Sequence, residues 1–531
     1  MPGRNVINTQ VLIIGAGITG AGLARDLSLR GVRCLLVEQK DVNAGASGAN
    51  HGLLHSGARY IKSDPASAEE CQKENHRLKG LASHCIDPCG GLFVAVNGDD
   101  ENYIADFPLL CAQCGIAAHP VDLNEARNLE PALSDQLIAA YRVNDGAIDP
   151  FRLTLDNIAQ AMEKGARLLR FTRVTGFTLG QSKITETQLV NTQTGEERHI
   201  QAEVVVSAAG AWAEQVAALA GIPIHVIYSK GSLLVTQNRL AQRVINRLRR
   251  PRDADILVPG GTVSILGTTS VRTPTPDAIY PEIDEIDRII EEVTLMIPAL
   301  ETTRYIRAYC GVRPLVGSDD SDDDRKVSRG YALIDHARDK VENFITITGG
   351  KLTTYRLMAE KTADLVCQRL GIGQPCQTGT EPLPASAGAQ WTEPGLAPRQ
   401  WIKLNDRDDL LLCECEMVSQ SSVDQIITGM GKLQTPLTLE AIGLRSRVGK
   451  GPCQGTFCSQ RLSAYLYERG LIKDDQGLVN LCRFLSERWR GQHPLLWDIA
   501  LIQSELQEAM HCGLFGLELT GASAKRSMDD E

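Results

Sequence analysis

The chain has 531 residues, of which 43% are hydrophobic and 23% charged, and its formal net charge is −10. This balance is typical of a soluble globular protein, and the length predicts several domains. The negative charge argues against nucleic acid as a main partner, because phosphate backbones bind basic surfaces. No signal peptide and no apolar run long enough to span a membrane is evident, so we expect a cytoplasmic protein.

The first forty residues predict a dinucleotide-binding unit. A buried strand over 9–14 leads into the turn Gly15-Ala16-Gly17-Ile18-Thr19-Gly20, a helix to about residue 30 and a second strand ending at Glu38. Gly15, Gly17 and Gly20 permit the tight turn, the approach of a pyrophosphate and close helix packing. The pyrophosphate is expected at the helix N-terminus, and Glu38 at the ribose hydroxyls. The N-terminal position and the small residues at 45–48 favour FAD; an NAD-dependent dehydrogenase is the weaker alternative.

The later elements follow in order. We expect helices near 66–85, 151–165, 282–296 and 353–370, a buried strand over 202–209, and mainly strands between 222 and 327. Residues 371–399 are rich in Gly, Pro, Ala and Ser and predict a linker. A small cysteine-bearing unit follows residue 410, and then a helical tail.

Five segments together carry a family resemblance. They are 45–60 (GASGANHGLLHSGARY), 230–232 (KGS), 311–315 (GVRPL), 328–331 (SRGY) and 348–356 (TGGKLTTYR). Over about residues 8–370 the chain resembles the family of FAD-dependent glycerol-3-phosphate dehydrogenases. With the cysteine unit, the whole chain resembles the catalytic subunits of the anaerobic bacterial members.

The resemblance implies a substrate site and an FAD site. Arg59 and Arg313 would hold the substrate phosphate, since a dianion binds guanidinium groups in bidentate fashion, with Tyr60, Arg329 and Lys351 nearby. The helix start at 349–353 would face the flavin C2 carbonyl, where a helix N-terminus stabilises negative charge. Besides the glycine turn and Glu38, the FAD contacts would be Ala46, Ser47, His51, Gly52, Val174, Ala209, Gly210, Gly350, Leu352 and Thr353.

The general base stays open. His55 matches a histidine of the family, and His51 lies in the same stretch; an imidazole suits proton abstraction from an alcohol. Either ring is equally compatible with a purely structural role. The aerobic relatives have a histidine directly after the KGS segment, whereas this chain has Leu233. We therefore expect His55, Arg59, Arg313 and Lys351 to be the catalytic set, with the base unassigned.

Four cysteines have the spacing of a metal site. Cys413 and Cys415 form a CxC pair, and after 37 residues Cys453 and Cys458 form a CxxxxC pair. Four thiolates in two close pairs suit a [2Fe–2S] cluster or a structural zinc, and a site without metal also stays open. The unit resembles the bacterioferritin-associated-ferredoxin-like [2Fe–2S] domain. The CxxC at Cys111 and Cys114 lies in a helical stretch without a second pair, and we expect it to be ordinary core or surface.

The expected fold is α/β: a discontinuous Rossmann-like FAD domain (1–95, 151–221 and 329–375) and a mainly β substrate domain (96–150 and 222–328). A linker (376–408), a small α/β or helical [2Fe–2S] domain (409–465) and a helical extension (466–531) follow. The resemblance implies oxidation of sn-glycerol 3-phosphate to dihydroxyacetone phosphate. Electrons would leave through the cluster and partner subunits to a membrane quinone, with the chain peripheral on the inner face of the cell membrane. The alternatives are a flavin dehydrogenase of a 2-hydroxy acid or secondary amine, and a non-catalytic redox-sensing or assembly subunit.

Overall fold

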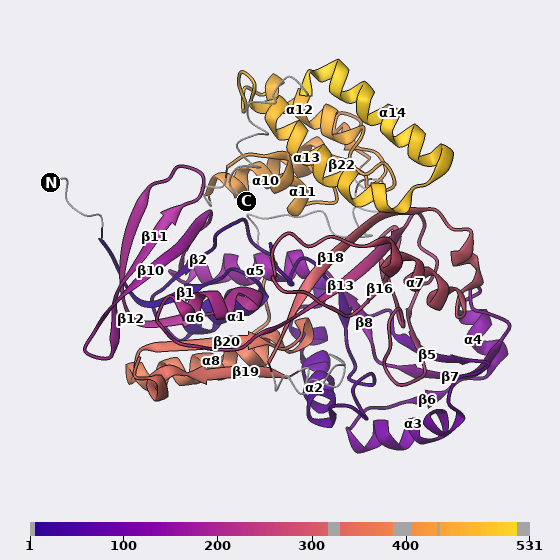
Figure 1. Ribbon diagram of the computed structural model, residues 1–531, viewed down its shortest axis with the longest axis horizontal. Helices are drawn as coiled ribbons and strands as arrows, with labels where there is room; N and C mark the ends of the chain where they lie inside the picture. Colours follow the sequence, from indigo (N-terminus) through magenta and orange to yellow (C-terminus); the bar gives the residue numbers. More distant parts are fainter. Residues whose placement is uncertain (1–5, 317–329, 386–400, 402–404, 433–435, 518–531) are drawn as a thin grey trace.

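The computed structural model describes residues 6–316, 330–385, 401, 405–432 and 436–517. Two large sheets lie side by side, and a helical C-terminal unit packs across both of them (Figure 1). A three-stranded sheet joins the two halves, formed by β3 (Leu53–Leu54), β4 (Ile86–Asp87) and β8 (Gly146–Ile148).

The first sheet has eight strands, and its centre is parallel. Along the main path the order is β10-β11-β12-β1-β2-β9, while β20 pairs with β12 and β19 with β20. The strands are β1 (Val6–Ile14), β2 (Cys34–Val37), β9 (Arg167–Leu169), β10 (Thr172–Gly180), β11 (Lys183–Asn191), β12 (Glu197–Ser207), β19 (Tyr331–Asp335) and β20 (Phe344–Gly349).

Both faces of this sheet are covered, which explains the continuous apolar run in β1. Val11 and Ile13 belong to the core formed with α1 (Ile18–Leu29), α5 (Pro150–Glu163) and α8 (Tyr355–Leu370). Leu12 and Ile14 point to the opposite core, which includes α6 (Ala213–Ala218). Successive strand residues face opposite sides, and a parallel strand buried on both faces needs apolar residues throughout.

The second sheet has nine strands and is mainly antiparallel. Its order is β17-β13-β16-β15-β14-β5-β7-β6, and β18 pairs with β13. The strands are β5 (Gly91–Val96), β6 (His119–Pro120), β7 (Leu137–Val143), β13 (Ile227–Thr236), β14 (Val244–Arg247), β15 (Ile256–Gly260), β16 (Val263–Gly267), β17 (Val271–Arg272) and β18 (Tyr305–Leu315).

Helices shield this second sheet. On α7 (Ile283–Thr294), Ile286, Ile289 and Val293 recur at helical spacing and pack on the sheet core;. The other helices of this half are α2 (Pro65–Leu81), α3 (Glu101–Gln113) and α4 (Leu123–Leu129). Cys111 and Cys114, at the end of α3, are 0% and 5% exposed, which confirms that this CxxC is core.

The C-terminal unit is a short hairpin followed by helices. Its elements are β21 (Leu411–Cys413), β22 (Val418–Ser419), α10 (Gln420–Lys432), α11 (Leu439–Leu444), α12 (Cys458–Glu468), α13 (Gln476–Gln492) and α14 (Asp498–Phe515).

Polar bridges fix this unit to both large sheets. The buried Arg445 guanidinium pairs with Asp41, 2.7 Å away, just after β2. Arg307 of β18 pairs with Glu487 of α13 at 3.1 Å.

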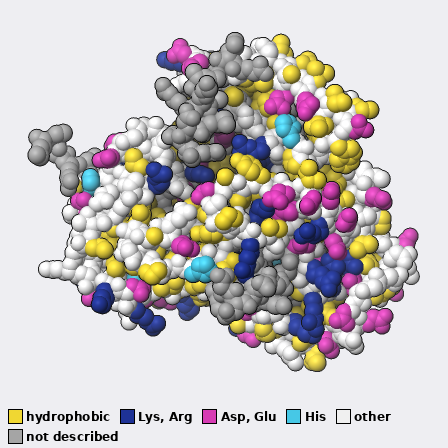
Figure 2. Space-filling model, viewed as in Figure 1, with side chains coloured by type: hydrophobic (Ala, Val, Ile, Leu, Met, Phe, Trp, Pro, Cys, Tyr) yellow, Lys and Arg dark blue, Asp and Glu magenta, His cyan; other side chains and the backbone are white. Residues whose placement is uncertain are grey.

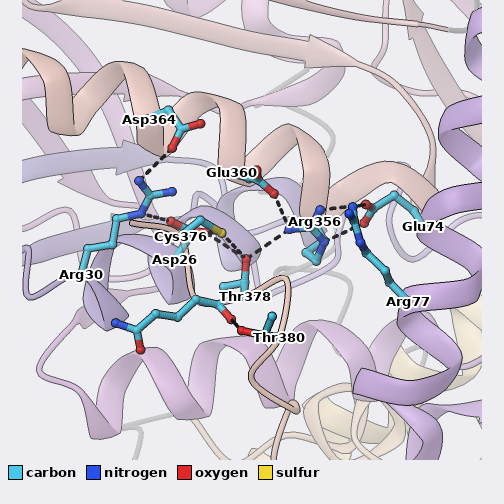
Figure 3. Close-up of polar contacts among 11 residues, drawn as sticks. Asp26, Arg30, Glu74, Arg77, Arg356, Glu360, Asp364, Cys376, Thr378 and Thr380 are labelled. Atoms are coloured by element: carbon cyan, nitrogen blue, oxygen red, sulfur yellow. Dashed lines mark hydrogen bonds and ion pairs between the residues drawn. The ribbon is translucent and has the colours of Figure 1, made fainter. Parts of the chain in front are cut away.

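The segment after α8 is anchored rather than free. Thr378 and Cys376 donate to the buried Asp26 of α1, which also holds Arg30 (Figure 3). Leu383 is buried, and its N–H donates to the Leu81 carbonyl at 2.7 Å. The first ten residues of the expected linker 376–408 are therefore part of the packed layer over α1 and α2. Residues 386–400 and 402–404 lie outside the described part of the chain.

Candidate active site

A cavity of about 500 Å³ opens where the carboxyl ends of β1, β12 and β20 meet the second sheet. Ligands of α/β proteins bind at such strand ends. Most of the residues predicted from the sequence line this cavity. They are Gly15, Gly17, Glu38, Ala46, Ser47, His51, His55, Arg59, Tyr60, Val174, Ala209, Gly210, Arg313, Gly350, Lys351 and Leu352.

The glycine turn has the geometry that a dinucleotide needs. Gly15 has φ +107°, and a Cβ there would lie 2.6 Å from the Ala208 carbonyl oxygen of the neighbouring strand. A Cβ on Gly20 would overlap the Gly15 carbonyl oxygen. The helix begins at Ile18, whose N–H donates to Ser47 Oγ at 2.9 Å. The turn thus brings the start of α1 to the cavity, and no side chain can replace Gly15 or Gly20 without a clash with backbone atoms;.

Glu38 fastens the turn to the second strand. Its carboxylate accepts the N–H groups of Ala16 and Lys40, each at 2.9 Å. Burial raises the pKa of Glu38 above its usual range, and these two N–H donors oppose the shift;. The Glu38 side chain lies on the cavity wall, and its contact with ribose hydroxyls stays a prediction;.

Besides Gly20 of the turn, two predicted contacts, Thr353 and Gly52, do not line the cavity. Thr353 is buried, and its Oγ1 accepts the His55 N–H at 3.0 Å, so it fixes the histidine segment to the start of α8. Gly52 has φ +69°, and its N–H donates to the Asn50 side chain. Both residues shape the 45–55 segment. Arg329 lies outside the described residues.

The two histidines lie together, with ring centroids 6.1 Å apart. His51 Nδ1 accepts the Leu53 N–H at 3.3 Å, so the neutral ring carries its proton on Nε2;. His55 Nε2 lies 3.4 Å from the Tyr60 hydroxyl. Burial, and then the charges of Arg313 and Arg59, lower the pKa of His51 to about 3. Burial, His51 and the charges of Arg59 and Lys351 also lower the pKa of His55. Both rings are therefore neutral near pH 7.

Three cations converge on these rings from different elements. Arg59 pairs with the fully buried Asp255 at 2.9 Å. Arg313, on β18, donates to the Thr268 hydroxyl and to the Thr269 carbonyl oxygen. Lys351 Nζ lies 4.7 Å from the centre of the Tyr60 ring, which is a cation–π distance;. The structure thus brings Arg59, Arg313 and Lys351 together although they are far apart in the sequence.

Leu233, the second residue after Gly231 of the KGS segment, also lines the cavity and presents an apolar side chain there. Lys230 of the KGS segment does not face the cavity; its Nζ lies 2.9 Å from Glu285 and 3.0 Å from Glu282. No local sequence pattern indicated Asp255, Thr268 or Thr269, because their contacts with Arg59 and Arg313 arise only from the fold.

The four C-terminal cysteines also come together. Cys415 Sγ lies 3.7 Å from Cys413 Sγ and 3.8 Å from Cys453 Sγ. Thiol hydrogen bonds from Cys415 and Cys458 lower the pKa of both Cys413 and Cys453. A Cβ on Gly451 would lie 2.7 Å from Cys415 Sγ, so the loop passes tightly over the sulfurs. Four convergent thiols, two from the β21–β22 hairpin and two from the glycine-rich segment leading into α12, can bind a metal centre;.

A second cavity, of about 1090 Å³, lies between this cysteine loop and the first cavity. The two cavities share Asn50 and His51 on one side, and the second reaches Lys450 and Gln454 on the other. The second cavity thus extends from the wall of the candidate active site to the loop that carries Cys453.

Comparison with known proteins identifies the family. Residues 10–365 match the family model of the FAD dependent oxidoreductases. The chain is 43% identical to the subunit designated A of the anaerobic glycerol-3-phosphate dehydrogenase of Escherichia coli K12, with 98% of this chain and 99% of that protein covered. The subunit designated A1 of the Haloferax volcanii enzyme is 36% identical, with 98% and 93% covered.

The chain belongs to the family of FAD dependent oxidoreductases. The glycerol-3-phosphate dehydrogenase from Bacillus halodurans, solved in complex with FAD, has the same fold: the TM-score is 0.63 at 20% identity, over 92% of this chain and 96% of that one. The α/β FAD-dependent oxidoreductase fold expected from the sequence is confirmed. Among the described residues of this family member, no helix has the length and hydropathy of a membrane span.

The crowding at the glycine turn makes a direct test possible. Gly20→Ala places a methyl group against the Gly15 carbonyl oxygen, so the purified variant should lack flavin absorbance. Gly80→Ala, in α2, is the control, because a Cβ there meets no atom within 4 Å. Folding of both variants is checked by circular dichroism. A folded Gly20→Ala protein with full flavin content would contradict the assignment of the turn.

Proposed function

We propose that the protein oxidises sn-glycerol 3-phosphate to dihydroxyacetone phosphate with FAD. The observation that carries the proposal is the convergence of Arg59, Arg313 and Lys351 beside two neutral histidines at the end of a dinucleotide cradle. Three cationic groups can bind a phosphate dianion, whereas a substrate with a single carboxylate needs fewer cations. FAD, when bound, supplies a two-electron acceptor for the alcohol carbon.

The cations hold and orient the substrate phosphate. Thr268 and Thr269 position Arg313, and Asp255 positions Arg59, so both guanidinium groups are held in place before substrate arrives. Such preorganisation saves the entropy of ordering two long side chains on binding. Leu233 adds an apolar wall that limits water around the reacting carbon.

His55 is our candidate for the general base. Its ring is neutral and lies beside Tyr60, whereas the Nδ1 lone pair of His51 is already used by the Leu53 N–H. The charges of Arg59 and Lys351 help to keep the pKa of His55 low in the free protein. A bound phosphate dianion offsets these charges, and so raises the proton affinity of His55 when the substrate hydroxyl needs a base.

The four cysteines fit a [2Fe–2S] cluster in charge as well as in number. Two partly buried cations near the loop, Lys450 and Arg488, make no ion pair among the described residues. Burial lowers the pKa of Lys450 to about 7 and that of Arg488 to about 9. Four thiolates around a cluster carry net negative charge, which compensates such cations. The cluster would supply one-electron transfer.

Partner subunits complete the proposed electron path. The cluster would pass electrons to them, and they would deliver the electrons to a membrane quinone. The relatives are named as subunits of an anaerobic dehydrogenase, which supports an assembly. On this proposal the chain is peripheral on the inner face of the cell membrane through its partners.

Replacing Arg313 tests the substrate. Arg313→Ala removes charge-assisted hydrogen bonds, each worth about 1.5–3 kcal/mol, so kcat/KM for glycerol 3-phosphate should fall by at least roughly 10- to 150-fold. Flavin content should stay at the wild-type level. The exposed Arg142, replaced by Ala, is the control. An unchanged KM would rule out the phosphate role, and faster turnover of a 2-hydroxy acid would favour the alternative substrate class.

Replacing His55 tests the base. His55→Asn keeps the size of the side chain but removes its basic nitrogen, so kcat should fall by about 10²- to 10⁴-fold with little change in KM. His51→Asn should lower kcat less. Steady-state kinetics with an artificial electron acceptor measures both. A larger loss of kcat in the His51 variant would reverse the assignment.

Replacing Cys415 tests the cluster. Cys415→Ser should lose iron and the low-temperature EPR signal of the dithionite-reduced protein, while flavin reduction by glycerol 3-phosphate continues. Cys482→Ser, on α13 and outside the proposed ligand set, should change neither signal. Metal analysis of the anaerobically purified wild type that finds zinc in place of iron, or no metal, would exclude the [2Fe–2S] cluster.

A further inference from the structure

The last described helix, α14, carries an exposed apolar stripe. Its outer side carries Ile499, Ile502, Leu506, Met510 and Leu514, each at least 56% exposed, and Trp497 just before the helix is 71% exposed. These positions recur every three or four residues and therefore form one stripe along the helix. Figure 2 shows hydrophobic side chains gathered over this helix at the upper right.

The inner side of α14 combines specific polar contacts with partly buried apolar residues such as Phe515. His511 is the one buried side chain of the helix; its ring lies 2.6 Å from the Gln460 amide nitrogen and contacts Trp489. Glu508 pairs with His493 at 3.1 Å. These contacts fix the rotation of the helix, so the apolar stripe faces outward because of specific interactions.

A large share of the exposed hydrophobic side chains of the protein lies in this stripe. Among the described residues, six of sixteen exposed large hydrophobic side chains lie between Trp497 and Leu514. Eighteen residues of helix are about 27 Å long at 1.5 Å per residue. A continuous apolar strip of that length marks an interaction site, because isolated exposed hydrophobic residues are ordinary but contiguous ones are not.

Charge indicates a protein partner rather than a bilayer. Within α14 the charged residues are Asp498, Glu505 and Glu508, and the helix has no Lys or Arg. Helices that lie on anionic membranes carry Lys and Arg on their polar face. The acidic rim instead fits a partner that presents an apolar surface bordered by basic side chains.

The position of the stripe indicates which partner binds there. Gln460, which contacts His511, lies half a turn beyond Cys458 at the start of α12. Phe457, next to this proposed cluster ligand, is 65% exposed. A protein covering α14 would therefore lie beside the cysteine site, where an electron can leave the chain.

We propose that the outer face of α14 docks the electron-accepting partner protein; this inference rests on the proposed function. Oxidation of the alcohol to the ketone releases two electrons and two protons. A one-electron redox centre in the partner would take the two electrons singly from the cysteine site. The protons pass to water.

Charge placed in the stripe tests the proposal. Leu506→Glu/Met510→Glu puts two carboxylates into the apolar face, and Gln503→Glu/Gln507→Glu adds the same charge at exposed polar positions of the helix. Each full-length protein is added to membranes of the source organism from which the wild-type chain has been removed genetically. Glycerol 3-phosphate oxidation is then measured with a soluble dye and, separately, by reduction of the membrane quinone pool.

The stripe variant (Leu506→Glu/Met510→Glu) should keep its dye-linked activity, but its quinone-linked rate should fall at least tenfold. The control variant (Gln503→Glu/Gln507→Glu) should keep both rates. An unchanged quinone-linked rate in the stripe variant would overturn the docking proposal. Absence of dye-linked activity in the wild type would instead overturn the proposed function.

Three further outcomes would assign the stripe to another occupant and overturn the proposal. The first is a wild-type dimer in solution that the stripe variant converts to a monomer. The second is stripe-dependent binding of the wild type to protein-free vesicles of phosphatidylglycerol and phosphatidylethanolamine. The third is faster maleimide labelling of Leu506→Cys after removal of residues 518–531, which would show that the chain's own end covers the stripe.

Discussion

The candidate active site depends on the close approach of two glycines across the β13–β18 pair. Gly231 lies opposite Gly311 in this ladder, and Arg313 lies two residues farther along β18. A Cβ on Gly231 would lie 2.7 Å from Cζ of Arg313, and one on Gly311 would lie 2.6 Å from the Ala49 carbonyl oxygen. The first glycine lets the guanidinium lie against the sheet, and the second brings the sheet against the 45–55 segment. Together they set the cation of one half beside the histidines of the other.

The distribution of charge explains how an acidic protein recognises an anion. The net charge of −10 is spread over the whole chain, whereas the cavity gathers Arg59, Arg313 and Lys351 beside buried neutral rings. Asp255 pairs with Arg59 and holds its guanidinium in place, but Asp255 itself does not line the cavity. Local fields in a desolvated cleft outweigh the average charge of the molecule, because screening is weakest where water is excluded.

Local motifs predicted the parts of the structure that depend on neighbouring residues. The strand–turn–helix–strand unit over 9–38, α7 and the start of α8 follow from glycine spacing and apolar periodicity, and they appear close to the expected bounds. The roles of Arg59 and Arg313 came from a family resemblance, not from spacing. Their supports, Asp255, Thr268 and Thr269, were not predictable, because they are 44 to 196 positions away in sequence and meet the arginines only in the folded chain. For the same reason composition predicted a linker after residue 370, although Thr378 and Leu383 pack on α1 and α2.

The central claim is that one chain oxidises glycerol 3-phosphate and moves the electrons from flavin to the cysteine site. Stoichiometric glycerol 3-phosphate added to the anaerobically purified protein, followed by visible and low-temperature EPR spectroscopy, tests it most directly. We expect bleaching of the oxidised flavin bands together with the appearance of a reduced-cluster EPR signal. Flavin bands that stay unchanged after the addition would contradict it.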